Sequence, residues 1–213
     1  MKRGILDVRL DERAIVGAPT SGVQLGVGRD GPVRLRLFRL SGTRMVVATR
    51  PDPVRLLVLR VAAAGTPVQV VTDRVGAWRP LLGDGAGHLV GDTEARASAG
   101  GVGPTLVVRD REAIRGAEEV QPWQCRLELR PRWTPAQLVG FARGDVTVFG
   151  ALPAEFVPGV ARAFDLPVRA AEPLARLDAT SFAVVRRGHV DYVTLDPTPA
   201  EAQALARAAQ LAS

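Results

Sequence analysis

Hydrophobic positions in residues 43–73 follow the order strand, helix, strand. The unbroken apolar run at 45–48 is typical of a strand that is buried on both faces of a parallel sheet. Residues 56–64 are apolar on almost every side, and Gly65 favours the end of this predicted helix. The valines of residues 68–71 then predict a second strand, which a right-handed crossover places parallel to the first. This stretch therefore predicts a βαβ unit.

The loop inside this unit lacks the features of a phosphate-binding loop. Such loops use glycines with converging backbone N–H groups, a lysine, and a serine or threonine for a metal. Residues 49–53 read Thr-Arg-Pro-Asp-Pro, and no glycine lies between Gly42 and Gly65. We expect Asp52 to cap the helix and Pro53 to occupy its first position. Two prolines remove N–H donors and the aspartate repels anions, so the sequence predicts no nucleotide cofactor.

Two further stretches predict hairpins with arginines on their exposed faces. In residues 22–38, apolar positions alternate with arginines around a turn at 29–31. Residues 182–185 and 190–195 predict a second hairpin around a short turn. The first hairpin is expected to bury Val33, Leu35 and Leu37. The candidate interaction surface consists of Arg34, Arg36, Arg39, Arg186 and Arg187.

The remaining patterns predict alternating strands and helices. Strands are expected at Thr105–Val108, Trp123–Leu129 and Val146–Phe149, and helices near 78–82, after the capping boxes that begin at Thr134 and Thr198, and at 152–166. The predicted fold class is α/β, with a mostly parallel sheet flanked by helices, in a degenerate P-loop or RecA-like domain with peripheral hairpins. Its predicted organisation is an N-terminal segment at 1–20 and one domain at 21–213 with a glycine-rich loop at 83–103.

Candidate catalytic chemistry is sparse. Asp110 follows a predicted strand, where a Walker B carboxylate would stand, and Arg109 and Arg111 flank it. Without a phosphate loop, we expect this aspartate to form a strand-end salt bridge or cap. The single cysteine, Cys125, lies on an apolar face and is expected to be core, and His189 is expected to be an exposed turn residue. No catalytic, cofactor-binding or metal-binding residue is predicted, and the protein is not expected to be an enzyme.

The charge of the chain is basic but diffuse. Its formal net charge is +6, and Lys2 is the one lysine among 28 basic residues, so a mechanism that needs a lysine is disfavoured. No basic stripe interleaved with aromatic residues is present, which makes nucleic acid an unlikely partner, although a nucleic-acid-binding module remains an alternative through the arginines of the first hairpin. One cysteine excludes an internal disulfide. No signal peptide or membrane-spanning run is visible, and we expect a cytoplasmic chain.

Several of these stretches resemble a known family. The segments VQLGVGRDGPVRLRLF, RMVVATRPDPVRLLVLRVAAAG, VQVVTD and PTLVVRD resemble the core of FtsK/SpoIIIE-type ATPase domains. GVQLGVGRDGPVRLRL with VLRVAAAGTPVQVVTDRVGAWRPLLG is more similar to the C-terminal region of EccE, a component of actinobacterial type VII (ESX) secretion systems. The similarity is best over 21–83 and extends to about Pro197.

This resemblance implies a structural subunit without chemistry of its own, in a complex built around an FtsK-like motor ATPase. The implied partners are other secretion subunits, including that motor, and a second copy of the chain. The family carries N-terminal transmembrane helices, whereas this sequence shows none, so the resemblance implies a soluble relative or a trimmed region that is peripheral to the inner membrane. An alternative stays open: a nucleotide-binding protein in which Arg50 and Arg55 replace the lysine and Asp110 holds the metal.

Overall fold

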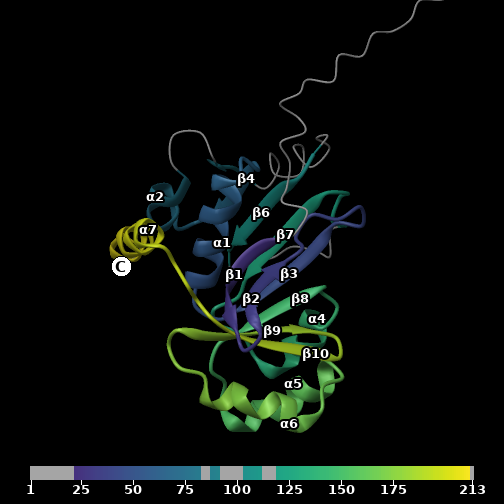
Figure 1. The fold of residues 1–213 in the computed structure, drawn as a ribbon. Coiled ribbons are helices and arrows are strands. Elements are labelled where there is room, and N and C mark those ends of the chain that lie inside the picture. The colour runs from purple at the N-terminus through teal and green to yellow at the C-terminus, as the bar shows by residue number, and fades with distance from the viewer. Residues whose placement is uncertain (1–21, 83–86, 92–102, 112–118, 212–213) are drawn as a thin grey trace, which may run out of the picture.

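A ten-stranded sheet runs through the computed structural model, which describes residues 22–82, 87–91, 103–111 and 119–211 (Figure 1). Its strands are β1 (Val23–Gly28), β2 (Gly31–Leu35), β3 (Thr43–Ala48), β4 (Val68–Thr72), β5 (Gly87–Leu89), β6 (Thr105–Asp110), β7 (Gln124–Leu129), β8 (Val146–Phe149), β9 (Ser181–Arg186) and β10 (His189–Thr194). The helices are α1 (Asp52–Ala63), α2 (Arg79–Leu82), α4 (Leu138–Phe141), α5 (Val157–Ala163), α6 (Val168–Ala171) and α7 (Pro199–Gln210). Short 3₁₀ turns are η2 (Val75–Ala77), η4 (Pro135–Gln137), η5 (Ala154–Phe156) and η6 (Glu172–Arg176).

The strands lie in the order β2-β1-β10-β9-β8-β3-β7-β6-β4-β5. All neighbours from β8 to β5 are parallel. The strands β9, β10, β1 and β2 extend this sheet through antiparallel pairs. The predicted α/β class, with a mostly parallel sheet flanked by helices, is thereby confirmed.

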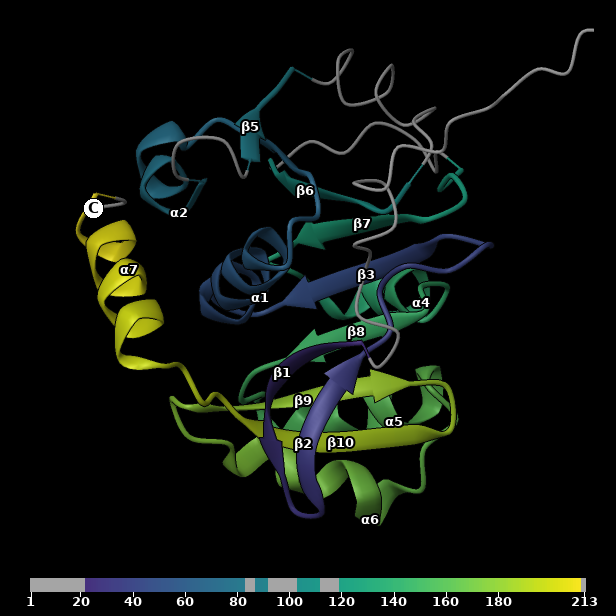
Figure 2. The same cartoon turned by 45° about the horizontal axis from the view of Figure 1, so that its top comes forward.

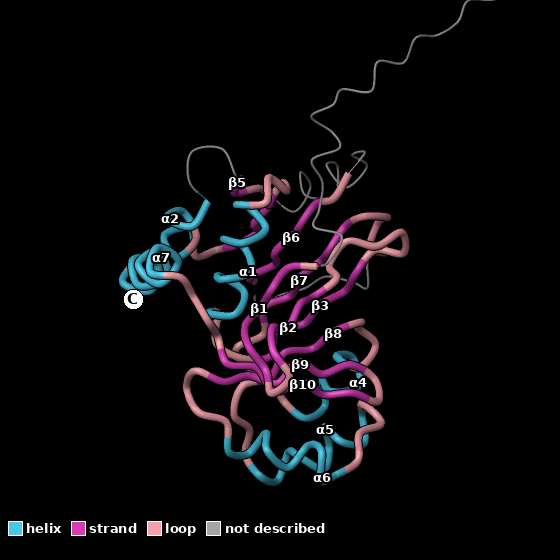
Figure 3. Tube along the Cα trace, in the orientation of Figure 1, coloured by secondary structure: helices cyan, strands magenta, loops and turns pink. Residues whose placement is uncertain are grey.

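Helices cover both faces of the sheet, as the two views in Figures 1 and 2 show. The helices α1, α2 and α7 pack on one face over a core that includes Val47, Leu57 and the fully buried Trp78. The helices α4, α5 and α6 pack on the other face over β3, β8 and β9, around Phe149 and Val160. The tube view shows α1 and α7 on one flank and α5 and α6 below β9 and β10 (Figure 3). Alternating side chains of the same strands feed both cores.

The predicted βαβ unit forms β3, α1 and β4. Residues Met45–Ala48 are buried, and the whole of β4 is buried as well. The helix begins one residue earlier than predicted: Pro51 is its N-cap, Asp52 is its first residue, and no side chain caps it. The prediction that Asp52 caps α1 was therefore wrong, because the preceding proline already has a helical conformation at φ −76° and ψ −11°. Gly65, at φ +76°, follows the end of the helix as expected.

The two arginine-bearing hairpins are present. β1 and β2 pair around a turn at 29–30, although β2 ends at Leu35, and β9 pairs with β10 along its length. Leu35 and Leu37 are buried and Val33 is half-buried, as the alternation predicts. Both capping boxes also form, at Thr134 before η4 and at Thr198 before α7.

Other expectations differ from the structure. The region predicted as a glycine-rich loop at 83–103 contains the short strand β5, because its backbone pairs with β4 at the edge of the sheet. Trp123 is outside β7 at φ +60° and is 42% exposed, so its predicted place on the apolar face of that strand was wrong. The turns α6 and η6 were not predicted. The segment 1–20, with a suggested strand at 5–10, lies outside the described residues.

One arginine links the start of the C-terminal helix α7 to α1 and β1. The guanidinium of Arg60 on α1 donates to both carboxylate oxygens of Glu201, at 2.8 and 3.0 Å. It also donates to the carbonyl oxygens of Gln24, at 2.9 Å, and Asp196, at 2.6 Å. α7 itself buries little side-chain surface, since Ala208 is its one fully buried residue. Arg60 thus connects α1, β1 and the start of α7.

We expect Glu201→Gln to lower the free energy of unfolding by about 1.5–3 kcal/mol, because Arg60 loses its charged acceptor. The hydrogen bond from Arg60 holds the pKa of the Glu201 carboxyl below its usual value. A carboxyl with a lowered folded pKa stabilises the protein above its unfolded pKa, about 4.3, and loses this effect as the pH falls through the folded value. The difference between parent and variant should therefore be full at pH 7 and shrink below about pH 4.

Urea unfolding at several pH values measures this difference. The matched control is Glu155→Gln, because Glu155 is exposed and forms no ion pair among the described residues. A Glu201→Gln effect that is as large at pH 3 as at pH 7 would show that the charge of Glu201 does not hold α7.

Candidate functional site

The carboxyl ends of the parallel strands lie along one edge of the sheet. At this edge β3 and β8 are neighbours. After β3 the chain passes through α1 to β4, on one side of this pair, whereas after β8 it continues to β9, on the other side. In open α/β sheets, such a switch point marks the crevice in which ligands bind. The candidate functional site, called the strand-end site below, therefore consists of the residues that end or follow β3, β4, β6 and β8.

Asp110, the last residue of β6, is the buried acid of the strand-end site. It is 5% exposed and lies beside Thr72 of β4 in the sheet register. Its Oδ2 accepts hydrogen bonds from Trp78 Nε1 at 2.6 Å, from Thr72 Oγ1 at 3.1 Å and from Arg74 Nε at 3.2 Å. Arg74 Nη2 also donates to Oδ1. Both carboxylate oxygens are thus occupied by groups of the protein itself.

This arrangement confirms the predicted strand-end salt bridge and changes the expected partner. The sequence pointed to the flanking Arg109 and Arg111 as neutralising groups, but Arg74 from the end of β4 forms the ion pair. Arg111 forms an ion pair with Asp73 instead, at 3.1 Å between Nε and Oδ1. Side chains alternate along β6, so the two flanking arginines cannot share the face of Asp110.

The loop after β3 is held by its own side chains. Arg50 Nε lies 3.0 Å from Asp52 Oδ2, which makes an ion pair across the first turn of α1. The guanidinium carbon of Arg50 also lies 4.9 Å from the ring centroid of Phe182, a cation–π contact. Asp52, which would repel an anionic ligand at this helix end, is therefore also the group that holds Arg50.

The gap between the ends of β3 and β8 is closed by close packing. A Cβ atom on Gly150 would clash with Thr49 Oγ1, so only glycine permits the two strand ends to approach this closely. Trp133 Nε1 donates to the carbonyl oxygen of Ala48 at 3.1 Å. The Trp133 ring packs against Phe149, with 5.7 Å between ring centroids. The switch point is thus filled by a threonine, a glycine and aromatic rings.

Arg55 is the one cation of the strand-end site that is buried without a strong partner. It lies in the first turn of α1, is 4% exposed, and its Nη1 is 3.9 Å from Asp52 Oδ1. Its Nε has no hydrogen-bond partner in the described part of the chain. Burial lowers the pKa of the guanidinium, and the charge of Asp52 opposes this shift. A buried guanidinium in this position could contact an anion at the helix N-terminus.

The five arginines of the predicted interaction surface fall into two groups in the structure, those with an ion pair and those without one. Arg34 and Arg36 are exposed and form no ion pair with a described residue. Arg39 instead forms an ion pair with Asp145 at 2.6 Å and donates to Thr43 Oγ1 at 3.0 Å, so it belongs to the framework. The second pair of arginines is also engaged: Arg186 with Asp191 at 3.2 Å, and Arg187 with Asp165 at 2.6 Å. Of the five arginines of the predicted surface, Arg34 and Arg36 are the two that form no ion pair with a described residue.

The other singled-out residues have structural roles. Cys125 is fully buried, as predicted, and burial raises the pKa of its thiol to about 12, which keeps it protonated and unreactive. His189 is exposed, as predicted, and its Nε2 lies 2.9 Å from Asp191 Oδ1. Within the described residues, no group of three or more histidine, cysteine or acidic side chains could hold a metal ion.

The sequence reasoning missed Arg74 and Trp78 as partners of Asp110. The helix expected near 78–82 forms as α2, but nothing in the local pattern of Trp78 shows that its indole N–H faces a carboxylate. The useful signal was chemical: a carboxylate buried at a strand end needs donors, and the residues that follow the neighbouring strand are the first place to look for them.

A magnesium–nucleotide group does not fit the residues of the strand-end site. It would need a free carboxylate for the metal and converging N–H groups with a lysine for the phosphates. Both oxygens of Asp110 already accept hydrogen bonds, and the loop at 49–53 has two prolines and neither glycine nor lysine. Among the described arginines of the site, Arg50 and Arg74 have close carboxylate partners, so Arg55 is the one that would suit a phosphate.

Comparison with known proteins identifies the fold. The structure is similar to that of VirB4 of Thermoanaerobacter pseudethanolicus, with a TM-score of 0.57 and 9% sequence identity over 88% of this chain and 99% of that chain. At this identity the similarity concerns the fold. No protein-family model matches the chain. No curated protein matches its sequence. None of the described helices is both long and apolar enough to span a membrane. The chain therefore has an α/β fold similar to that of VirB4.

Proposed function

We propose that this protein is a non-catalytic structural subunit of a secretion complex, with an ATPase-like fold that does not bind nucleotide. The observation that carries the proposal is the Asp110 carboxylate, whose oxygens are bonded to Trp78, Thr72 and Arg74. Releasing it for a metal would leave a buried indole N–H and an arginine without their acceptor, which is costly. The similarity to VirB4 supports the secretion context.

The finer assignment follows from the sequence resemblance. We propose that the complex is of the type VII (ESX) kind and that the chain takes an EccE-like place in it, in contact with an FtsK-like motor ATPase or with a second copy of itself. Association with such a complex would bring the chain to the inner membrane. Its action then lies in a binding surface on a rigid core.

Nucleotide binding is the second candidate function, and one observation favours it. Arg55 is buried at the N-terminus of α1 with an unpartnered Nε. Anions bind readily at helix N-termini, and arginine can hold a phosphate with two hydrogen bonds. Asp52, in the same turn, opposes such binding by its charge.

The first test is a thermal-shift titration with ATP and GTP, each with Mg²⁺ and with Mg²⁺ alone as the control. A ligand at 100 times its dissociation constant would stabilise the protein by about 2.7 kcal/mol. We expect no saturable shift up to millimolar nucleotide. A saturable shift would overturn the proposal in favour of the second candidate, and its loss in Arg50→Gln, whose side chain is partly exposed, would locate the nucleotide at the strand-end site.

The second test concerns the first hairpin. Arg34→Glu with Arg36→Glu should leave the melting temperature almost unchanged, because exposed charges contribute only about 0–1 kcal/mol each. The same change should weaken self-association, measured by analytical ultracentrifugation, or co-purification with the motor ATPase. Arg39→Glu should instead destabilise the fold, because it places a carboxylate beside Asp145.

The matched control for the hairpin is Arg143→Glu with Arg162→Glu, because both arginines are exposed and lie on other elements. It changes the net charge by the same amount. If the hairpin variant associates as well as the parent, or if the control variant loses as much association, the hairpin is not the interface.

A further inference from the structure

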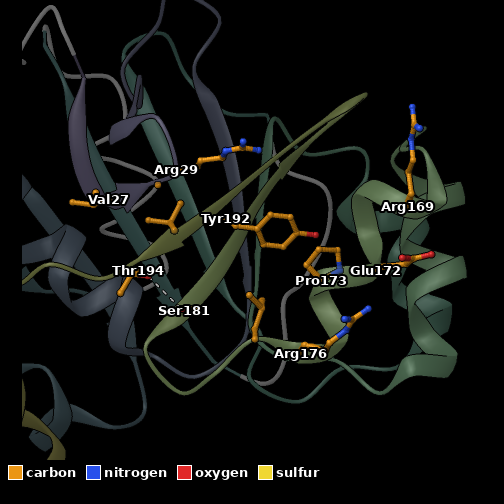
Figure 4. Close-up of a pocket in the computed structure, with 12 residues that line it drawn as sticks. Val27, Arg29, Arg169, Glu172, Pro173, Arg176, Ser181, Tyr192 and Thr194 are labelled. Atoms are coloured by element: carbon orange, nitrogen blue, oxygen red, sulfur yellow. Dashed lines mark hydrogen bonds between the residues drawn. The ribbon is translucent and has the colours of Figure 1, made fainter.

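A cleft of about 570 Å³ lies on the antiparallel part of the sheet, between the β1–β2 turn and the helical turns α6 and η6. Figure 4 shows Tyr192 in the middle of this cleft, with Arg29 on the sheet side and Arg169, Glu172 and Arg176 on the helical side. The walls therefore come from segments that are far apart in the sequence. None of these residues belongs to the strand-end site.

The cleft carries an excess of unpaired positive charge. Arg29, Arg169 and Arg176 are all exposed, and none forms an ion pair with a described residue. Glu172 is the one acidic residue among the lining residues, so the lining has a charge of +2. By contrast, a carboxylate partner is present for each of Arg39, Arg60, Arg74, Arg186 and Arg187. Three unpaired guanidinium groups around one cleft favour an anionic ligand.

The floor of the cleft is apolar and rigid. Val27 is 39% exposed, which is unusual for a valine in a strand of this sheet. The hydroxyl of Tyr192 donates to the carbonyl oxygen of Ala170 at 2.7 Å, which fixes the ring against the segment of α6. A ligand in the cleft would thus meet an aliphatic and an aromatic surface between the arginines.

An unpaired strand edge begins at the same place. β1 pairs with β10 only through Val27 with Thr194 and Gly28 with Val193, and then the chain turns away into β2. Gly28 and Val193, the two residues of this last pair, both line the cleft. Beyond it, residues 189–191 of β10 pair with β9 alone in the described sheet. Such an edge offers backbone N–H and C=O groups to an added strand.

We propose that this cleft binds an extended acidic peptide segment of a partner protein. Its carboxylates would pair with Arg29, Arg169 and Arg176, an aliphatic side chain would lie on Val27 and Tyr192, and its backbone would continue along the free edge of β10. A small anion would use the arginines but neither the apolar floor nor the strand edge, which is why a peptide fits better. The cleft does not depend on nucleotide binding, so this proposal holds whether or not the strand-end site binds a nucleotide.

Fluorescence anisotropy with a fluorescein-labelled octapeptide of alternating Glu and Val tests the proposal on the full chain. We expect saturable binding that weakens as salt screens the charges. Arg29→Gln with Arg169→Gln and Arg176→Gln should weaken it about tenfold or more, because three charge-assisted contacts are lost. Glu172→Gln should strengthen it about two- to threefold, because a like charge is removed.

The matched control is Arg143→Gln with Arg162→Gln and Arg207→Gln, which removes three exposed arginines elsewhere and should change the affinity less than about twofold. Circular dichroism checks that every variant is folded. The proposal is overturned if the parent does not bind the peptide, if both triple variants lose affinity equally, or if a Gln–Val octapeptide binds as well. It is also overturned if inorganic phosphate or ATP displaces the peptide at equal concentration, because the cleft is then a small-anion site.

Discussion

The Asp110 carboxylate, buried at the end of β6, accepts hydrogen bonds from Trp78, Thr72 and Arg74. A charge buried to this extent costs several kcal/mol unless it is paired and hydrogen-bonded, so its donors are constrained in position. They come from the end of β4 and from the residue before α2, and α2 in turn packs against α7. One carboxylate thus fixes the neighbouring strand ends and the base on which the C-terminal helix lies, in the place where an ATPase would hold its metal.

Other arginines of this chain, whose net charge is +6, are paired with carboxylates in the same way. Arg60, Arg74 and Arg39 each hold together segments that are distant in sequence, and their charges are used within the fold. Other exposed arginines form no ion pair with a described residue, among them Arg34 and Arg36 on the first hairpin and the three that surround the cleft. The two proposed binding surfaces rest on these five arginines.

The sequence predicted what local patterns determine. Apolar runs and caps identified β3, α1, β4 and both hairpins, because burial on one or two faces imposes a period on neighbouring residues. It erred at Asp52, where Pro51 takes the cap, and at β5, whose three residues are strand only through pairing with β4. It recognised Asp110 as a salt-bridge residue but not its partner, because Arg74 is far away in sequence. No local signal could have assembled the cleft around Tyr192, whose walls meet only in the folded chain.

The hydrogen bond that keeps Asp110 occupied can be observed directly at the indole N–H of Trp78. In a protein labelled with ¹⁵N-tryptophan, the indole N–H of this residue should exchange slowly with solvent, because it is buried and donates to Asp110 at 2.6 Å. Its resonance is assigned by its loss in Trp78→Phe, and the exposed Trp123 provides the internal reference for free exchange. The account predicts that millimolar Mg²⁺ and ATP leave the Trp78 resonance and its protection unchanged. A saturable shift of this resonance, or a loss of its protection on adding Mg²⁺ and ATP, would show that Asp110 is released to a ligand and would contradict the account.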